Sequence, residues 1–113
     1  MVSACGAGGG PEKVVRDFIA AINARNYAKA REYVSPDKRD DYEQVLEGYK
    51  ERGVKYPTIR EIVVRDSIWP DEKIVTVILT KSYLGGEPEE TEDVFYVEKL
   101  KGRWYISSVP PWY

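Results

Sequence analysis

The sequence contains no histidine, one cysteine and one methionine in 113 residues. Without imidazole, a Ser-His-Asp triad, a Cys-His pair and a zinc site built on histidine are all excluded. A single cysteine cannot form a disulfide within the chain. We therefore expect no metal, no cofactor and no catalytic residue of these kinds.

Long hydrophobic runs are also missing, because no stretch approaches the roughly 18 apolar residues that span a bilayer. The 17 basic and 19 acidic residues give a formal net charge of −2 and a pI near 5.3. The basic residues are scattered singly among acidic ones, which argues against a nucleic-acid partner. A content of 42% hydrophobic and 32% charged residues is typical of one globular domain.

Residues 1–10, MVSACGAGGG, predict a flexible tether in front of a domain formed by residues 11–113. The run Val2-Ser3-Ala4-Cys5 resembles the end of a bacterial lipoprotein signal, in which the cysteine receives the lipid. This resemblance implies lipid attachment at Cys5 and an extracytoplasmic protein of the bacterial cell envelope, bound to the membrane through its N-terminal lipid only. The alternative is an incidental free cysteine.

Helical patterns fill the first half of the domain. Pro11 favours a helix start, and apolar residues then recur at helical spacing up to Ile22. Asn26 is a suitable cap for a second short helix, and Ser35-Pro36 starts a third helix that ends at Gly53. The predicted buried stripes are Val14, Val15, Phe18, Ile19 and Ile22, then Tyr27, Ala30, Tyr33 and Val34, and finally Tyr42, Val45, Leu46 and Tyr49.

From Thr58 the pattern alternates, which predicts strands joined by short turns and therefore an antiparallel meander. The four predicted strands are Thr58–Ile68, Lys73–Leu84, Glu92–Leu100 and Arg103–Val109. The expected fold class is α+β, with N-terminal helices packed on a curved four-stranded antiparallel sheet.

A two-residue turn at Lys101-Gly102 would pair Val97 with Ile106 and Lys99 with Trp104. This register predicts an inner face without a carboxylate, on which Lys99 is the only ionisable residue, and an acidic run Glu87–Asp93 at a solvated hairpin tip. The predicted inner face contains Val75, Val77, Leu79, Phe95, Val97, Trp104 and Ile106. The predicted outer face contains Ile74, Ile78, Val94, Tyr96, Tyr105 and Val109.

The outer face is more aromatic than a solvated sheet requires. We therefore expect a homodimer packed sheet to sheet, with Ile78, Tyr96 and Tyr105 in the interface.

Two segments carry a resemblance to a known superfamily: PEKVVRDFIAAINARNYAKAREYVSP at 11–36 and VEKLKGRWYISSV at 97–109. They resemble the nuclear transport factor 2-like superfamily of cystatin-like folds, and within it small bacterial lipoprotein domains of unknown function that are similar to lumazine-binding proteins. The resemblance implies a cone between helices and sheet. In members of the superfamily this cone holds an acid/base aspartate and a tyrosine, or binds a ligand, or belongs to an accessory domain of a cell-envelope protein.

The expected function is a non-catalytic binding or protein-interaction module of the cell envelope. The alternatives are a small-molecule binder that uses the cone, and an enzyme of the isomerase or cyclase type. A buried Asp–Tyr pair would favour the enzyme, whereas a cone lined by tyrosines would favour the binder. The residues predicted to line such a pocket are Tyr27, Tyr33, Tyr42, Tyr49 and Trp104.

Overall fold

The computed structural model of the chain describes residues 10–108. Helices come first and strands follow, so the predicted α+β order is confirmed. The elements are α2 (Pro11–Asn23), α3 (Tyr27–Glu32), the 3-10 turn η1 (Pro36–Lys38), α4 (Arg39–Arg52), β1 (Lys55–Asp66), β2 (Glu72–Ser82), β3 (Glu89–Leu100) and β4 (Arg103–Ile106). Apart from Gly10, the predicted tether lies outside the described residues, and so do Cys5 and Val109.

Local sequence signals set the helix ends. Helix α2 begins at Pro11, as predicted, and α3 is capped by the side chain of Asn26, which accepts a hydrogen bond of 3.1 Å from the backbone N of Lys29. Helix α4 ends at Gly53, whose φ of +62° lies in the left-handed region that glycine adopts at little cost. The predicted third helix is split, because a 3-10 turn at Pro36–Lys38 precedes α4.

The sheet is an antiparallel meander in the order β1-β2-β3-β4. The predicted turn at Lys101-Gly102 is confirmed, with φ of +51° and +80° at the two residues, as a type I′ hairpin turn requires. The predicted pairs Val97–Ile106 and Lys99–Trp104 are also confirmed. Strand β1 begins at Lys55 rather than Thr58, and β3 at Glu89 rather than Glu92, because both extensions pair with the C-terminal end of β2.

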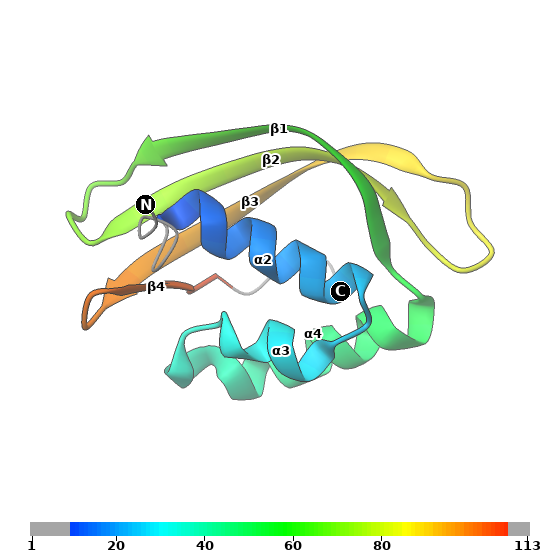
Figure 1. Cartoon of the computed structure of the whole chain (residues 1–113), viewed down its shortest axis with the longest axis horizontal. Coiled ribbons are helices and arrows are strands. Elements are labelled where there is room, and N and C mark those ends of the chain that lie inside the picture. The colour runs from blue at the N-terminus through cyan, green and yellow to red at the C-terminus, as the bar shows by residue number, and fades with distance from the viewer. Residues whose placement is uncertain (1–9, 109–113) are drawn as a thin grey trace, which may run out of the picture.

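The sheet curves over α2, which lies along its concave side, and α3 and α4 lie farther from the sheet (Figure 1). Register shifts in β1 near Ile59 accompany this bend, because a bulge bends its strand. The apolar core fills the space between sheet and helices. In its centre the ring of Phe18 lies 6.0 Å from that of Tyr42 and 6.1 Å from that of Phe95, both edge-on.

The two sheet faces divide as predicted for the assigned residues within 10–108, although the outer residues Ile74, Ile78 and Tyr105 are only partly exposed. The inner residues Val75, Val77, Leu79, Phe95, Val97 and Ile106 are buried, and Trp104 is partly buried against them. On the outer face Val94 and Tyr96 are exposed.

Candidate functional site

The inner face of the sheet carries a carboxylate, Asp93, which the sequence analysis wrongly placed at a solvated tip. Asp93 lies inside β3, opposite Val77 of β2, and is only 5% exposed. It shares its face with Phe95 and Val97, because side chains on a strand alternate between faces with a period of two. The prediction that the inner face has no carboxylate is therefore wrong.

The cation Lys81 shares this inner face. Lys81 continues the row of Val75, Val77 and Leu79 along β2 and is 7% exposed. Its Nζ lies 5.9 Å from the ring centre of Tyr56 and 5.7 Å from that of Tyr83, distances at which a cation is attracted to an aromatic face. The prediction that Lys99 is the only ionisable residue of this face is also wrong.

Two buried tyrosines complete the group around Asp93. Tyr49 of α4 and Tyr56 of β1 are 2% and 3% exposed, and their phenol groups are hydrogen-bonded to each other. The charge of Asp93 acts on both phenols. We call Tyr49, Tyr56, Lys81 and Asp93 the cone cluster; its members come from α4, β1, β2 and β3.

One oxygen of the Asp93 carboxyl group lacks a hydrogen bond from the described residues. Within residues 10–108, its Oδ2 is buried and has no hydrogen-bond partner. Burial raises the pKa of this carboxyl above its ordinary value, and the positive charge of Lys81 partly offsets the rise. A buried acceptor without a partner costs about 1–3 kcal/mol, so the chain holds this oxygen at the expense of stability.

Burial changes the proton affinity of the other members as well. It lowers the pKa of Lys81, although the charge of Asp93 opposes this. It raises the pKa of the Tyr49 and Tyr56 phenols. Both phenols therefore stay protonated at neutral pH and can donate or accept hydrogen bonds.

The β2–β3 connection is attached to the end of α4. The backbone N of Leu84 donates to the backbone O of Arg52 at 2.8 Å, which holds the end of β2 against the end of α4. A Cβ on Gly53 would lie 3.1 Å from the Cβ of Leu84, so the two segments are in tight contact. Gly85 follows with φ of +80°, and residues 84–90 are exposed.

The structure does not bring the predicted pocket residues into one cavity. Tyr42 and Tyr49 are core residues, and the Tyr42 hydroxyl donates to the backbone O of Ser108 at 2.6 Å. Tyr33 and Trp104 are partly buried against the core. Tyr27 lines a separate groove between α3 and α4.

The groove has a volume of about 280 Å³. Arg31 crosses it, with Nε 2.6 Å from Oε1 of Glu43. Its walls thus carry charges of both signs beside one aromatic ring, a composition that specifies no ligand class. The lining residues are Tyr27, Ala28, Arg31, Glu43, Leu46, Glu47 and Lys50.

Two negative findings apply to residues 10–108. No cluster of three or more cysteine, aspartate or glutamate side chains is arranged to hold a metal ion. No helix there has the length and hydropathy of a membrane span.

Comparisons with known proteins address the fold. No protein-family model matches the sequence, and no curated protein shows significant sequence similarity to it. Solved structures do match; one of them, from Nostoc punctiforme, is described as having a cystatin-like fold, and another, from Shewanella oneidensis, as nuclear transport factor 2-like. This chain has the cystatin-like fold.

Three of the matching structures illustrate the likeness. RPA3114, a SEC-C motif containing protein from Rhodopseudomonas palustris, has a TM-score of 0.71 and 23% identity over 89% of this chain and 77% of its own. A protein of unknown function from Nostoc punctiforme has a TM-score of 0.66 and 13% identity over 84% and 81%. A candidate polyketide cyclase from Xanthomonas campestris has a TM-score of 0.61 and 10% identity over 85% and 86%.

Proposed function

We propose that this protein binds a small polar ligand in the cone, with Asp93 as the group that receives it. The observation that carries the proposal is the buried Oδ2 of Asp93, which has no hydrogen-bond partner among the described residues. Buried polar atoms in folded proteins are almost always paired, and an exception calls for an explanation such as a catalytic role or a bound water or ion. A ligand with an N–H, O–H or cationic group would satisfy this oxygen.

The other members of the cone cluster define the rest of the ligand. Lys81 supplies a positive charge on the same face, which suits an acceptor or anionic group of the ligand. The rings of Tyr49 and Tyr56 supply apolar surface and phenol groups that keep their protons. The expected ligand is therefore compact, with a donor at one side and an acceptor at the other.

Entry to the cone requires local movement, because every member of the cone cluster is at most 7% exposed. Leu84 and the exposed residues after it are held to α4 by the contact between Leu84 and Arg52. Gly85 and Gly86 give this connection the backbone freedom that opening needs. Binding is then expected to be slower than diffusion, because only the open state is competent.

Acid/base catalysis is a second candidate function. The raised pKa of Asp93 and the phenols beside it are the features that a proton-transferring enzyme of the isomerase or cyclase type uses. Candidate polyketide cyclases from Xanthomonas campestris and Pseudomonas putida share the fold. Buried Asp93 beside Tyr49 and Tyr56 is the Asp–Tyr arrangement expected of such an enzyme, and ligand binding at Asp93 is the step that both candidate functions share.

We also propose that the natural protein is an extracytoplasmic lipoprotein of the bacterial envelope. The support is the run Val2-Ser3-Ala4-Cys5 and the glycine-rich segment after it. Mass spectrometry of the N-terminal peptide of the protein from its natural host tests this directly. A peptide with unmodified Cys5 would reject the lipid anchor.

Native mass spectrometry of the protein purified gently from its natural host tests the binding function. We expect a co-purifying small molecule, and we expect Asp93→Asn to lose it while the matched exposed variant Asp66→Asn keeps it. Asp66 is a suitable control because it lies at the other end of the sheet, beside Lys73. A protein without bound molecule, or equal retention by Asp93→Asn, would reject the proposal.

Turnover separates the two candidate functions. If the identified molecule is converted by the wild type and not by Asp93→Asn, the protein is an enzyme. If it is bound and released unchanged, the protein is a binder.

A further inference from the structure

Two large apolar side chains stand at the tip of the β1–β2 hairpin. Ile68 is 88% exposed and Trp69 is 62% exposed. Exposure of a single apolar residue is ordinary, but two adjacent ones at the end of a molecule are a feature that usually meets a partner. We propose that this hairpin tip inserts into the interface of an anionic lipid bilayer.

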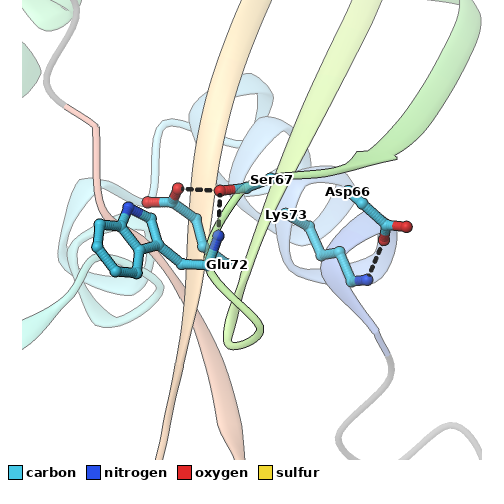
Figure 2. Close-up of polar contacts among 5 residues, drawn as sticks. Asp66, Ser67, Glu72 and Lys73 are labelled. Carbon is cyan, nitrogen blue, oxygen red and sulfur yellow. Dashed lines mark hydrogen bonds and ion pairs between the residues drawn. The ribbon is translucent and has the colours of Figure 1, made fainter.

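The tip is held in a defined conformation, so its exposure is not that of a loose loop. The Ser67 hydroxyl donates to Oε1 of Glu72 at 2.6 Å, and its oxygen accepts from the backbone N of Trp69 at 3.1 Å. An ion pair between Asp66 and Lys73 joins the strands just before the turn (Figure 2). Because these contacts fix the turn, little conformational entropy is lost when the tip is immobilised in a membrane.

Basic side chains adjoin the tip. The backbone N of Lys99 donates to the backbone O of Asp71 at 2.8 Å, which joins the β1–β2 turn to the neighbouring β3–β4 hairpin. That hairpin presents Lys99, Lys101 and Arg103, all exposed, together with Leu100 at 38% exposure. Three nearby acidic groups are engaged within the protein: Asp66 by Lys73, Glu72 by Ser67, and Glu98 by a 2.6 Å hydrogen bond from Ser35. A fourth, Asp71, is exposed in the turn itself and reduces the positive charge of the tip.

The combination of exposed apolar residues at the tip with basic residues beside it favours a lipid bilayer over a protein as the partner. Tryptophan prefers the headgroup region, where its ring is buried while its N–H stays hydrated, and lysine and arginine near the surface are attracted by anionic lipids. The start of α2 lies at the same end of the molecule as this tip (Figure 1). A chain anchored through Cys5 would therefore approach the membrane with the hairpin first, and in this respect the inference draws on the proposed envelope location.

Vesicle binding by the unlipidated 113-residue chain tests the inference without the anchor. The probe is a phosphatidylcholine vesicle with about 30% phosphatidylglycerol, since anionic lipid supplies the surface potential. We expect binding in flotation assays, weakened roughly tenfold for each of Ile68→Ser and Trp69→Ser, as the loss of one buried apolar side chain implies. Lys101→Glu should weaken it roughly fivefold or more, and pure phosphatidylcholine should bind less.

The matched control is Leu84→Ser. It removes an apolar residue from the β2–β3 hairpin whose exposure, 79%, lies between those of Ile68 and Trp69. It should leave vesicle binding unchanged. No binding by the wild type, or equal binding by the Ile68→Ser/Trp69→Ser variant with an unchanged circular dichroism spectrum, would overturn the inference. So would a self-association that the double variant abolishes in the absence of vesicle binding, since the tip would then contact protein. If the vesicle experiment gives a negative result, the ligand proposal and the lipid attachment at Cys5 are still tested by their own experiments.

Discussion

Replacing Asp93 should make the protein more stable, which is unusual for a buried charged residue. Its Oδ2 has no hydrogen-bond partner in residues 10–108, and the residue is 5% exposed. Removing an unpaired buried acceptor recovers about 1–3 kcal/mol of unfolding free energy. Asp93→Leu also adds apolar surface to the core but removes the counter-charge of Lys81, so the Tm should rise by about 4 °C for a domain of this size.

The pH dependence follows from the raised pKa of Asp93. The carboxyl ionises at lower pH in the unfolded chain than in the folded protein, so the folded state binds more protons between those two values. The free energy of unfolding should therefore fall as pH rises from the ordinary pKa of aspartate through the raised one, and the penalty should persist at higher pH. Tyr49 and Tyr56 face the same space, and burial raises their pKa values further above this range, whereas burial lowers the pKa of Lys81.

The assay is urea unfolding followed by tryptophan fluorescence, repeated from mildly acidic to neutral pH for the wild type, Asp93→Asn and Asp93→Leu. In both variants the free energy of unfolding should no longer show the contribution of Asp93 to its pH dependence. At neutral pH, Asp93→Leu should be more stable than Asp93→Asn. The control Asp66→Asn alters an exposed ion pair and should change stability by less than about 0.5 kcal/mol. A lower stability of both Asp93 variants at neutral pH would mean that the carboxylate has favourable partners, and the argument for a ligand would fail.

Three further predictions concern the fold and the outer face. Gly53→Ala should lower the free energy of unfolding by about 1–2 kcal/mol, because an L-residue is strained at φ of +62° and its Cβ would press on Leu84. The control Gly10→Ala, whose Cβ would have nothing within 4 Å, should lower it far less. Equal losses in urea unfolding would refute this reason. Phe18→Ala should cost about 3–5 kcal/mol through loss of the ring contacts with Tyr42 and Phe95, and an unchanged unfolding midpoint would contradict the assignment of the core. If the outer face forms a homodimer, sedimentation should find a dimer that Tyr96→Arg dissociates and Leu84→Ser does not; a monomer at high micromolar concentration would remove the dimer.

Much of the fold was predictable because its signals are local. Pro11, Asn26 and Gly53 mark helix ends through backbone geometry alone, and Lys101-Gly102 fixes a hairpin register without reference to the rest of the chain. By contrast, the predicted first residues of β1 and β3 were wrong. Both are set by pairing with the end of β2: Lys55 pairs with Ser82, and Glu89 pairs with Lys81 across the β2–β3 turn. Neither lysine nor glutamate favours a strand by its own propensity.

The candidate site was missed for a different reason. Asp93 ends an acidic run, and a charged residue next to a turn usually faces water. Yet the period of two that places Phe95 and Val97 inside also places Asp93 inside, and the same rule extends the row of Val75, Val77 and Leu79 to Lys81. Two opposite charges on the inner faces of adjacent strands were therefore readable from the sequence. The lack of a hydrogen-bond partner at Oδ2 of Asp93 within residues 10–108 was not, because it depends on how the surrounding elements pack.

The ligand and membrane proposals place two tasks at opposite ends of the same sheet. Strand β2 runs from Glu72, at the exposed hairpin, to Ser82, next to Lys81 of the cone cluster. At about 3.3 Å per residue these ends are roughly 30 Å apart. A molecule that lies hairpin-down on a bilayer would thus hold the mouth of its cone well above the headgroups, and the ligand would arrive from water rather than from the lipid. Sites this far apart without shared contacts are expected to be energetically independent. The Ile68→Ser/Trp69→Ser variant should therefore retain its small molecule, and addition of the ligand should leave vesicle affinity unchanged; coupling in either direction would mean that the sheet transmits a change from one end to the other.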